Sequence, residues 1–270
     1  MGFSWISLVV AAITGGVVGL LASLLVPGTR DEQNKGAVAA IVLIAVLAAH
    51  FLLSPRLESM YAMRTIDKTL SQNPAFSAIK TYDNAAYTSL MADIKAAMEK
   101  GKTQNQISAM VRTHIGAVVQ KRLPQASNDS AVAYMQVMLQ EMKEMKAQDG
   151  NVCFQFLFPQ EGSFVDPTKF ISAETRKADL EALGQVIKHA SLMPQPLPRE
   201  AEVMLLITPI VNDLGTKYGA GMRDLQNPNA PGVNKARLCG MLIDMYSQIL
   251  QLPGEQNGKV VRFMLGQAAK

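Results

Sequence analysis

The stretch FSWISLVVAAITGGVVGLLASLLV at residues 3–26 decides how this chain is organised, together with GAVAAIVLIAVLAAHFLLS at residues 36–54. Neither stretch contains Asp, Glu, Lys or Arg. A helix rises ~1.5 Å per residue, so about 20 apolar residues cross a hydrocarbon core of ~30 Å. The first stretch exceeds that length, the second just meets it, and the polar turn TRDEQNK at residues 29–35 separates them. The pattern predicts a transmembrane hairpin over residues 1–55.

A cleaved signal peptide is the alternative interpretation of residues 3–26. Such a peptide begins with a basic segment and has an apolar run of about 7–15 residues. Here no Lys or Arg precedes the run, the run is longer, and a second apolar stretch follows it. We therefore favour the transmembrane interpretation, in which the lipid bilayer is the first partner of the chain.

Small residues recur at every fourth position of the first predicted span and so share one helix face: Ala11, Gly15, Gly19 and Ser23. In lipid, small residues let two helix backbones approach closely enough for dispersion contacts. Two interpretations stay open. The two spans pack on each other, or this face docks a second copy of the chain or a span of a partner protein.

The charges that flank the two spans give opposing signals about the side of the membrane that holds the rest of the chain. Arg30 and Lys35 lie in the connecting turn, whereas Arg56, Arg64 and Lys68 follow the second span. Positive charge tends to stay in the cytoplasm, and the first span usually dominates the outcome. Because no Lys or Arg precedes the first span, we expect a multi-pass protein of the plasma (inner) membrane with its soluble domain outside the cytoplasm, in the periplasm.

The two cysteines of the chain, Cys153 and Cys239, both lie beyond the hairpin. If that part of the chain is exported, an even pair of cysteines predicts a disulfide. If it is cytoplasmic, the same residues are two buried thiols. The disulfide prediction is therefore coupled to the predicted topology.

Residues 56–270 carry helix signals and predict one all-α domain of about seven or eight helices. Gly101 occupies the position that ends a helix in a left-handed conformation. Thr103 and Gln106 then form a capping box that begins the next helix. The aromatic patch at residues 152–159 is expected to form a buried helical turn.

Two apolar patterns predict core positions in this domain. Four methionines recur at a 3-4-3 spacing, which places Met135, Met138, Met142 and Met145 on one helix stripe. Such a stripe indicates core packing, although thioethers also bind Cu(I) or line an adaptable groove. The helix expected over residues 198–214 is apolar on every side between residues 203 and 211, which predicts a place in the middle of the core.

The loop at residues 160–167 is our candidate for a contact with a protein partner, because it is long and carries aromatic side chains at its border and centre, Phe158 and Phe164. The alternative is a packed loop that Phe164 anchors to the domain.

Nucleic-acid binding is not expected. The net charge is only +4, and the Lys and Arg residues are scattered among acids rather than gathered in a dense run.

An enzyme, a metal site and a cofactor site are not expected either. The three histidines show no zinc-ligand spacing, and no HExxH, GxSxG, phosphate-loop or dinucleotide signature occurs. Ser77 and Lys80 match an SxxK pattern, but the companion KTG pattern of that enzyme class is missing.

The sequence favours a membrane-anchored helical accessory or interaction protein, a subunit or scaffold of an envelope membrane complex. Its expected partners are the bilayer and either a protein or a second copy reached through the hairpin. The alternative is a membrane-tethered protein that binds a small apolar or lipid ligand in a methionine-lined cavity. A hydrolase with an unrecognised site is a third possibility.

Overall fold

The computed structural model describes residues 60–158 and 169–267. The chain divides into two compact units, Met1–Thr69 and Leu70–Lys270. In the described residues all regular structure is helical, and none of them forms a strand. The predicted spans at 3–26 and 36–54 lie outside the described residues. Among the residues that are described, no helix is both long enough and apolar enough to cross a membrane.

Residues 60–71 are helical, and nine further α-helices follow in the described part of the chain. These are α3 (Pro74–Tyr82), α4 (Asn84–Glu99), α5 (Gln104–Arg122), α6 (Asn128–Gln148), α7 (Gly150–Leu157), α8 (Ala173–Leu192), α9 (Glu200–Tyr218), α10 (Lys235–Leu250) and α11 (Gln256–Gln267). Two 3-10 helices, η1 (Leu123–Gln125) and η3 (Gly219–Leu225), extend α5 and α9. The all-α prediction is confirmed, with more helices than the expected seven or eight.

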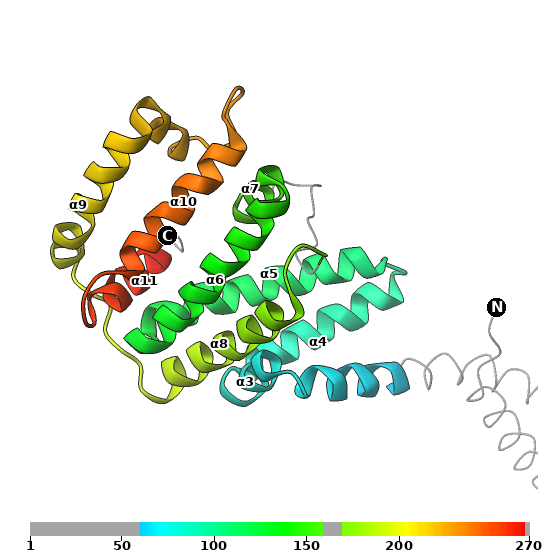
Figure 1. Cartoon of the computed structure of the whole chain (residues 1–270). Coiled ribbons are helices and arrows are strands. Elements are labelled where there is room, and N and C mark those ends of the chain that lie inside the picture. Colours follow the sequence, from blue (N-terminus) through cyan, green and yellow to red (C-terminus); the bar gives the residue numbers. More distant parts are fainter. Residues whose placement is uncertain (1–59, 159–168, 268–270) are drawn as a thin grey trace, which may run out of the picture. The chain divides into compact units, whose positions relative to one another are not determined.

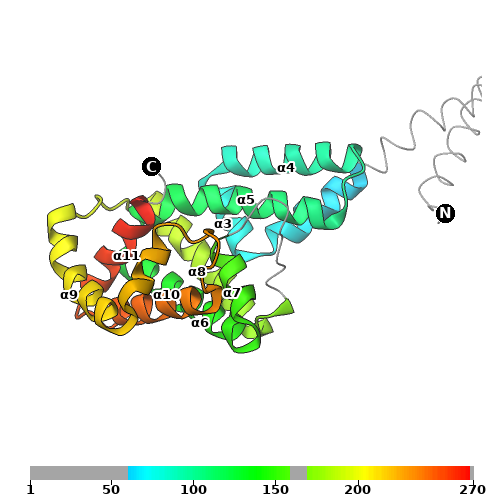
Figure 2. The ribbon, with the colours of Figure 1, turned by 90° about the horizontal axis from the view of Figure 1, so that it is seen from above.

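Helix α6 occupies the middle of the second unit, where it packs against α7, α8, α10 and α11. Helices α4 and α5 lie side by side, and α3 packs on α8 (Figure 1). Helix α9 lies at the outer edge of the unit in both ribbon views and contacts α10, α11 and η3 (Figure 2). The largest core cluster joins residues of η1, α6, α8, α9, α10 and α11. A second cluster joins α3, α4, α5 and α8.

The helix ends follow the local signals of the sequence. Gly101 has φ 66° after α4, and the Thr103 hydroxyl and the Gln106 side chain form both bonds of the predicted capping box. Ser172 caps α8 by accepting a hydrogen bond from the Thr175 N–H at 3.0 Å. The aromatic patch forms α7, as predicted.

The methionine stripe of α6 is a buried seam, as predicted. Met135, Met142 and Met145 are 2%, 1% and 0% exposed, and Met138 is half-buried. Burying such a side chain is worth roughly 1.5–3 kcal/mol relative to leaving it in water. The seam therefore contributes to the stability of this unit.

The prediction that residues 203–211 lie in the middle of the core is wrong. Val203 and Ile210 are buried, but Leu205 is 78% exposed. The reason is the position of α9 at the edge of the unit, where neighbours cover only one side of the helix. Helix α9 also continues past the expected end at residue 214, to Tyr218.

The buried carboxylate of Asp83 joins the α3–α4 junction to the end of α5. It lies between α3 and α4, is 7% exposed, and accepts hydrogen bonds from Arg122 Nη2 at 2.6 Å and Lys121 Nζ at 3.0 Å. Burial alone raises the pKa of the Asp83 carboxyl, but the hydrogen bonds from Lys121 and Arg122 outweigh burial and lower this pKa.

Asp83→Asn is expected to lower the free energy of unfolding by about 1–3 kcal/mol at neutral pH, because Arg122 loses a buried anionic partner. A carboxyl with a lowered pKa stabilises the fold above its unfolded pKa of about 4 and loses that effect as pH falls. The difference in unfolding free energy between the variant and the parent protein should therefore shrink in acid. Urea unfolding at several pH values measures it.

The matched control is Glu99→Gln, which removes an exposed carboxylate 3.9 Å from Lys95. This change should cost under about 0.5 kcal/mol. Equal losses in the two variants would show that the Asp83 contacts add nothing beyond a surface ion pair.

Candidate interaction surface

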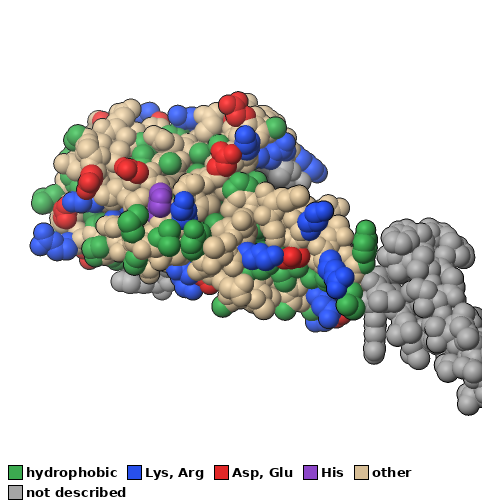
Figure 3. Space-filling view, turned by 90° about the horizontal axis from the view of Figure 1, so that it is seen from below, with side chains coloured by type: hydrophobic (Ala, Val, Ile, Leu, Met, Phe, Trp, Pro, Cys, Tyr) green, Lys and Arg blue, Asp and Glu red, His purple; other side chains and the backbone are tan. Residues whose placement is uncertain are grey.

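Exposed apolar side chains are concentrated in residues 192–211. The described residues include nine exposed large hydrophobic side chains, and six of them belong to this segment: Leu192, Met193, Leu197, Met204, Leu205 and Val211. They come from the end of α8, the linker 193–199 and α9. Figure 3 shows groups of hydrophobic side chains between charged ones on the face seen from below. Exposed apolar patches mark contact sites. We call these six residues the 192–211 apolar surface.

Side-chain hydrogen bonds from α10 and α11 hold α9 in place. Lys259 Nζ of α11 donates to Glu202 Oε1 at 2.7 Å, and Gln248 Nε2 of α10 donates to Asp213 Oδ2 at 2.7 Å. The inward side chains of Val203, Ile210 and Leu214 belong to, and are buried in, the main core cluster. Helix α9 is therefore held by the core and by α10 and α11, and its outward apolar side chains face solvent.

A cluster of charges fixes the end of α9. Asp244 of α10 accepts a hydrogen bond from Lys217 Nζ at 2.5 Å and another from the Tyr218 hydroxyl. Burial raises the pKa of Asp244, but the bonds from Lys217 and Tyr218 outweigh burial and lower it. Burial and the bond to Asp244 raise the pKa of Tyr218 to about 12. Arg237 donates to the Tyr218 carbonyl at 2.5 Å. Because these groups satisfy one another, the cluster has a structural role.

A groove of about 960 Å³ lies between α6 and α8. Its lining combines alanines and amides with three carboxylates, those of Glu144, Glu174 and Glu181. The described residues that line it include no methionine, and the methionines of the α6 seam are buried instead. The groove therefore lacks the methionine lining that the ligand-binding alternative predicted.

The pKa values of two carboxyl groups on α6 are shifted in opposite directions. Glu144 accepts hydrogen bonds from the Ser172 N–H at 2.6 Å and the Thr175 hydroxyl at 2.6 Å. Burial raises the pKa of Glu144, but these bonds and one from Gln140 together outweigh burial and lower it. Glu141 is 4% exposed, and burial followed by the charge of Asp179 raises its pKa to about 8, against the opposing charge of Arg112. The hydrogen bonds of Glu144 therefore tie α6 to the start of α8 and favour its charged form, whereas burial favours the neutral form of Glu141.

The described residues offer a weak basis for hydrolytic chemistry. Ser127 Oγ lies 3.3 Å from His189 Nδ1, but the same oxygen accepts the Ser130 N–H as the cap of α6. No carboxylate in the described part of the chain contacts His189, and neither residue lines the α6–α8 groove. Within the described ranges, no group of three or more His, Cys, Asp or Glu residues could hold a metal ion.

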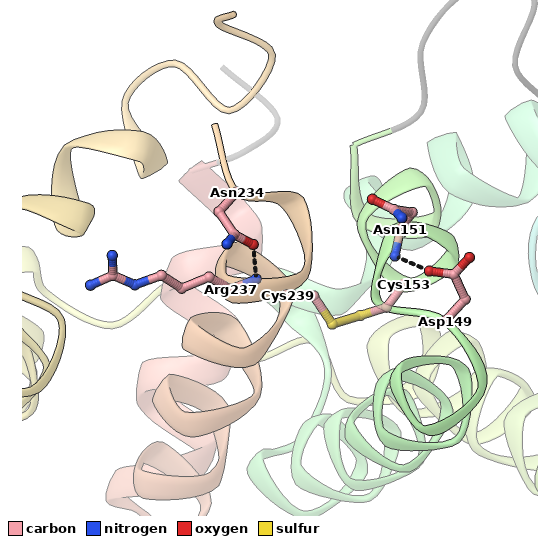
Figure 4. Close-up of a disulfide and its surroundings, with 6 residues drawn as sticks. All are labelled: Asp149, Asn151, Cys153, Asn234, Arg237 and Cys239. Carbon is pink, nitrogen blue, oxygen red and sulfur yellow. Dashed lines mark hydrogen bonds between the residues drawn. A yellow bond between two sulfur atoms is a disulfide. The ribbon is translucent and has the colours of Figure 1, made fainter. Parts of the chain in front are cut away.

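Cys153 of α7 and Cys239 of α10 form a disulfide, as predicted (Figure 4). Their Cα atoms are 6.0 Å apart, and both residues are fully buried. The bond closes a loop of 86 residues and joins α7 to α10. Nearby, the Asp149 carboxylate accepts the Asn151 N–H at 2.8 Å, and the Asn234 side chain accepts the Arg237 N–H at 2.9 Å. These caps fix the start of each helix that carries a cysteine.

The other predicted site residues are only partly described. Phe158 follows α7 and is half-buried. Its ring centroid lies 5.1 Å from that of Phe154, and the two rings are tilted by 38°. Phe164 and the loop 160–167 lie outside the described residues, and so does the small-residue face of Ala11, Gly15, Gly19 and Ser23. The partner-loop prediction and the membrane-packing prediction stay predictions.

Sequence reasoning missed the 192–211 apolar surface. The signal was present, because a helix that is apolar on every side either lies in a core or exposes part of its apolar side chains. Only the contacts of α9 decide between these two outcomes. Comparisons with protein-family models, with curated proteins and with solved structures found no match.

Glu141→Gln is expected to reduce the fall in unfolding free energy as pH rises. A buried carboxyl with a raised pKa gives its full stability below its unfolded pKa, about 4.5, and loses it as pH rises toward the folded value of about 8. At pH 8 the variant should exceed the parent by on the order of 1–3 kcal/mol.

Glu144→Gln is the matched control on the same helix. It should change the free energy of unfolding in the opposite direction. Its carboxylate stabilises the fold above the unfolded pKa, so this variant should lose stability at neutral pH. Chemical denaturation between pH 5 and pH 8 measures both. A Glu141→Gln protein that is less stable than the parent at pH 8 would contradict the assignment.

Reduction of the Cys153–Cys239 bond should lower the free energy of unfolding. A closed loop of this length restricts the unfolded chain by about 4 kcal/mol in the chain-entropy description. Urea midpoints with and without reductant measure the effect, and the Cys153→Ala, Cys239→Ala double variant should not respond to reductant. An unchanged midpoint in the parent protein would contradict a stabilising bond.

Proposed function

We propose that this chain is a membrane-anchored helical interaction protein, a subunit or scaffold of a complex at the plasma (inner) membrane. Residues 1–55 would anchor it as a transmembrane hairpin, and residues 56–270 would present a binding surface. The observation that carries the docking role is the exposure of Leu205, 78%, on a helix whose opposite side is buried in the core. The anchoring role rests on the two apolar stretches of the sequence.

The position of the soluble domain outside the cytoplasm is part of this proposal. Disulfides persist in oxidising compartments and are rare in the cytosol. The buried Cys153–Cys239 bond supports the same side of the membrane that the first predicted span favours.

A buried methionine seam favours docking over ligand binding. Small-molecule sites are concave and mostly apolar. In this chain Met142 and Met145 are 1% and 0% exposed and are packed in the core, and no methionine lines the groove between α6 and α8.

Leu205→Gln should reduce the yield of crosslinked protein products of the full chain in native membranes and leave the membrane retention of the chain unchanged. Burying an apolar side chain of this size at an interface contributes about 1–2 kcal/mol or more, so recovery of the products should fall roughly tenfold. The matched control is Met98→Gln on α4, which changes another exposed apolar side chain, 37% exposed.

Two results would contradict the proposal separately. Extraction of the full chain from membranes by alkaline carbonate would contradict the anchor. The same crosslinked products from Leu205→Gln and Met98→Gln proteins would contradict the docking surface.

A further inference from the structure

The linker 193–199 between α8 and α9 is held on the domain by few contacts of its own. It carries two residues of the 192–211 apolar surface, Met193 and Leu197, which are 61% and 44% exposed. Of the linker residues only Pro198 is not exposed, so burial contributes little to the position of the linker. Residues 194, 196 and 198 are prolines, which have no N–H to donate. Hydrogen bonds to the remaining polar groups of the linker must therefore fix its place.

Arg262 of α11 bonds the linker to two other segments of the chain. Its Nη2 donates to the Pro196 carbonyl at 2.5 Å. Its Nε donates to the Pro124 carbonyl of η1 at 3.1 Å, and its Nη1 donates to Asn128 Oδ1 of α6 at 3.0 Å. The planar guanidinium group carries its donors in a fixed fork, which suits several acceptors at once. One side chain therefore joins the linker, η1 and α6.

The guanidinium of Arg262 is a buried charge whose described hydrogen-bond partners are all neutral. Arg262 is 3% exposed, and burial lowers its pKa. Asn128 separates it from an acid, because Asn128 Nδ2 donates in turn to Glu255 Oε2 at 3.3 Å. A buried charge is costly unless it is hydrogen-bonded, and bonds from a charged donor are stronger than those from a neutral one. Two carbonyls and an amide oxygen therefore replace the water that this cation loses, and the Pro196 carbonyl is one of the three.

Two weaker contacts hold neighbouring parts of the same segment. The Gln195 N–H donates to the Gln125 carbonyl at 2.9 Å, which is one bond between neutral groups. Lys259, one helical turn before Arg262 on α11, donates to Glu202 at the start of α9, but the two side chains of this pair are 34% and 38% exposed. Exposed ion pairs contribute little to stability. The buried bond from Arg262 should therefore decide the position of the linker.

We propose that Arg262 positions the linker part of the docking surface. Its guanidinium holds the Pro196 carbonyl against η1 and α6, and so fixes where Met193 and Leu197 meet a partner. Helix α9 carries another part of this surface and is held in the main core cluster by its own buried side chains. This inference rests on the proposed function, because it names the residue that arranges the proposed docking surface.

Hydrogen exchange of the purified full chain in phosphatidylcholine vesicles tests this role. Arg262→Met removes all three bonds and leaves an unbranched apolar side chain in the buried site. The Gln195 amide should then exchange about tenfold faster than in the parent protein, because local opening controls its exchange. Mass spectrometry with peptide fragmentation measures the rate. The amides of α3 and α4 should keep their parent rates. An unchanged Gln195 rate, or an equal acceleration in α3 and α4, would overturn the inference.

Lys259→Met is the matched control, because it removes a cation one turn away on the same helix. Its Gln195 amide should exchange at nearly the parent rate, and an acceleration equal to that of Arg262→Met would overturn the assignment to Arg262. Arg262→Lys covers the case in which circular dichroism shows that Arg262→Met does not fold. It keeps the charge, but its single nitrogen cannot replace the guanidinium fork, so Gln195 should again exchange faster. Parent-like exchange of Gln195 in Arg262→Lys would also overturn the inference.

Photocrosslinking in native membranes separates this inference from the proposed function. A crosslinker is attached to Leu197→Cys or to Leu205→Cys, while the native cysteines are already bonded. Arg262→Met should lower the yield of protein products from position 197 and leave the yield from position 205 unchanged. Equal yields from position 197 in the parent and in Arg262→Met would overturn the positioning role. If neither position gives protein products in the parent, the docking role is contradicted, whereas the exchange measurement still tests the linker by itself.

Discussion

The buried seam of α6 is the interaction on which the rest of this fold depends. Its methionines contribute to the core while α7, α8, α10 and α11 surround the helix. Helices α3 and α5 pack on α8 instead, and α4 packs on α3 and α5. Helix α9 lies beyond α10 and α11, so neighbours cover one side of it and its remaining apolar side chains face solvent. The exposure of Leu205 therefore follows from the layering of the helices.

Polar contacts explain why α9 does not rotate its apolar side inward. Turning the helix would break the ion pair of Glu202 with Lys259 and the bonds of Asp244 with Lys217 and Tyr218. It would also remove Val203 and Leu214 from the core. Burial of the outer face therefore requires another surface. A protein anchored by the predicted hairpin would have such a surface within reach, because a membrane holds its copies and partners at high local concentration.

Local signals in the sequence predicted the fold well, because they act over a few residues. The capping box at Thr103, the glycine at position 101 and the methionine seam all depend on neighbours within one or two helical turns. The Cys153–Cys239 bond was predicted from the number of cysteines and the expected compartment. The exposure of residues 204, 205 and 211 could not be predicted in this way. This exposure depends on which helices contact α9. Contacts between segments that are distant in the sequence produce no periodic pattern of residues from which they could be predicted.

In the proposed docking role, a protein surface covers the outward side chains of Met204, Leu205 and Val211 on α9 when the chain is in its membrane. A nitroxide attached at position 205 of the full chain measures this directly, through its mobility and its collisions with oxygen. We expect an immobilised label with few oxygen collisions at high protein density, and a mobile label after dilution with excess lipid. A label that is mobile at every density, or that collides with oxygen as a lipid-exposed label does, would contradict it.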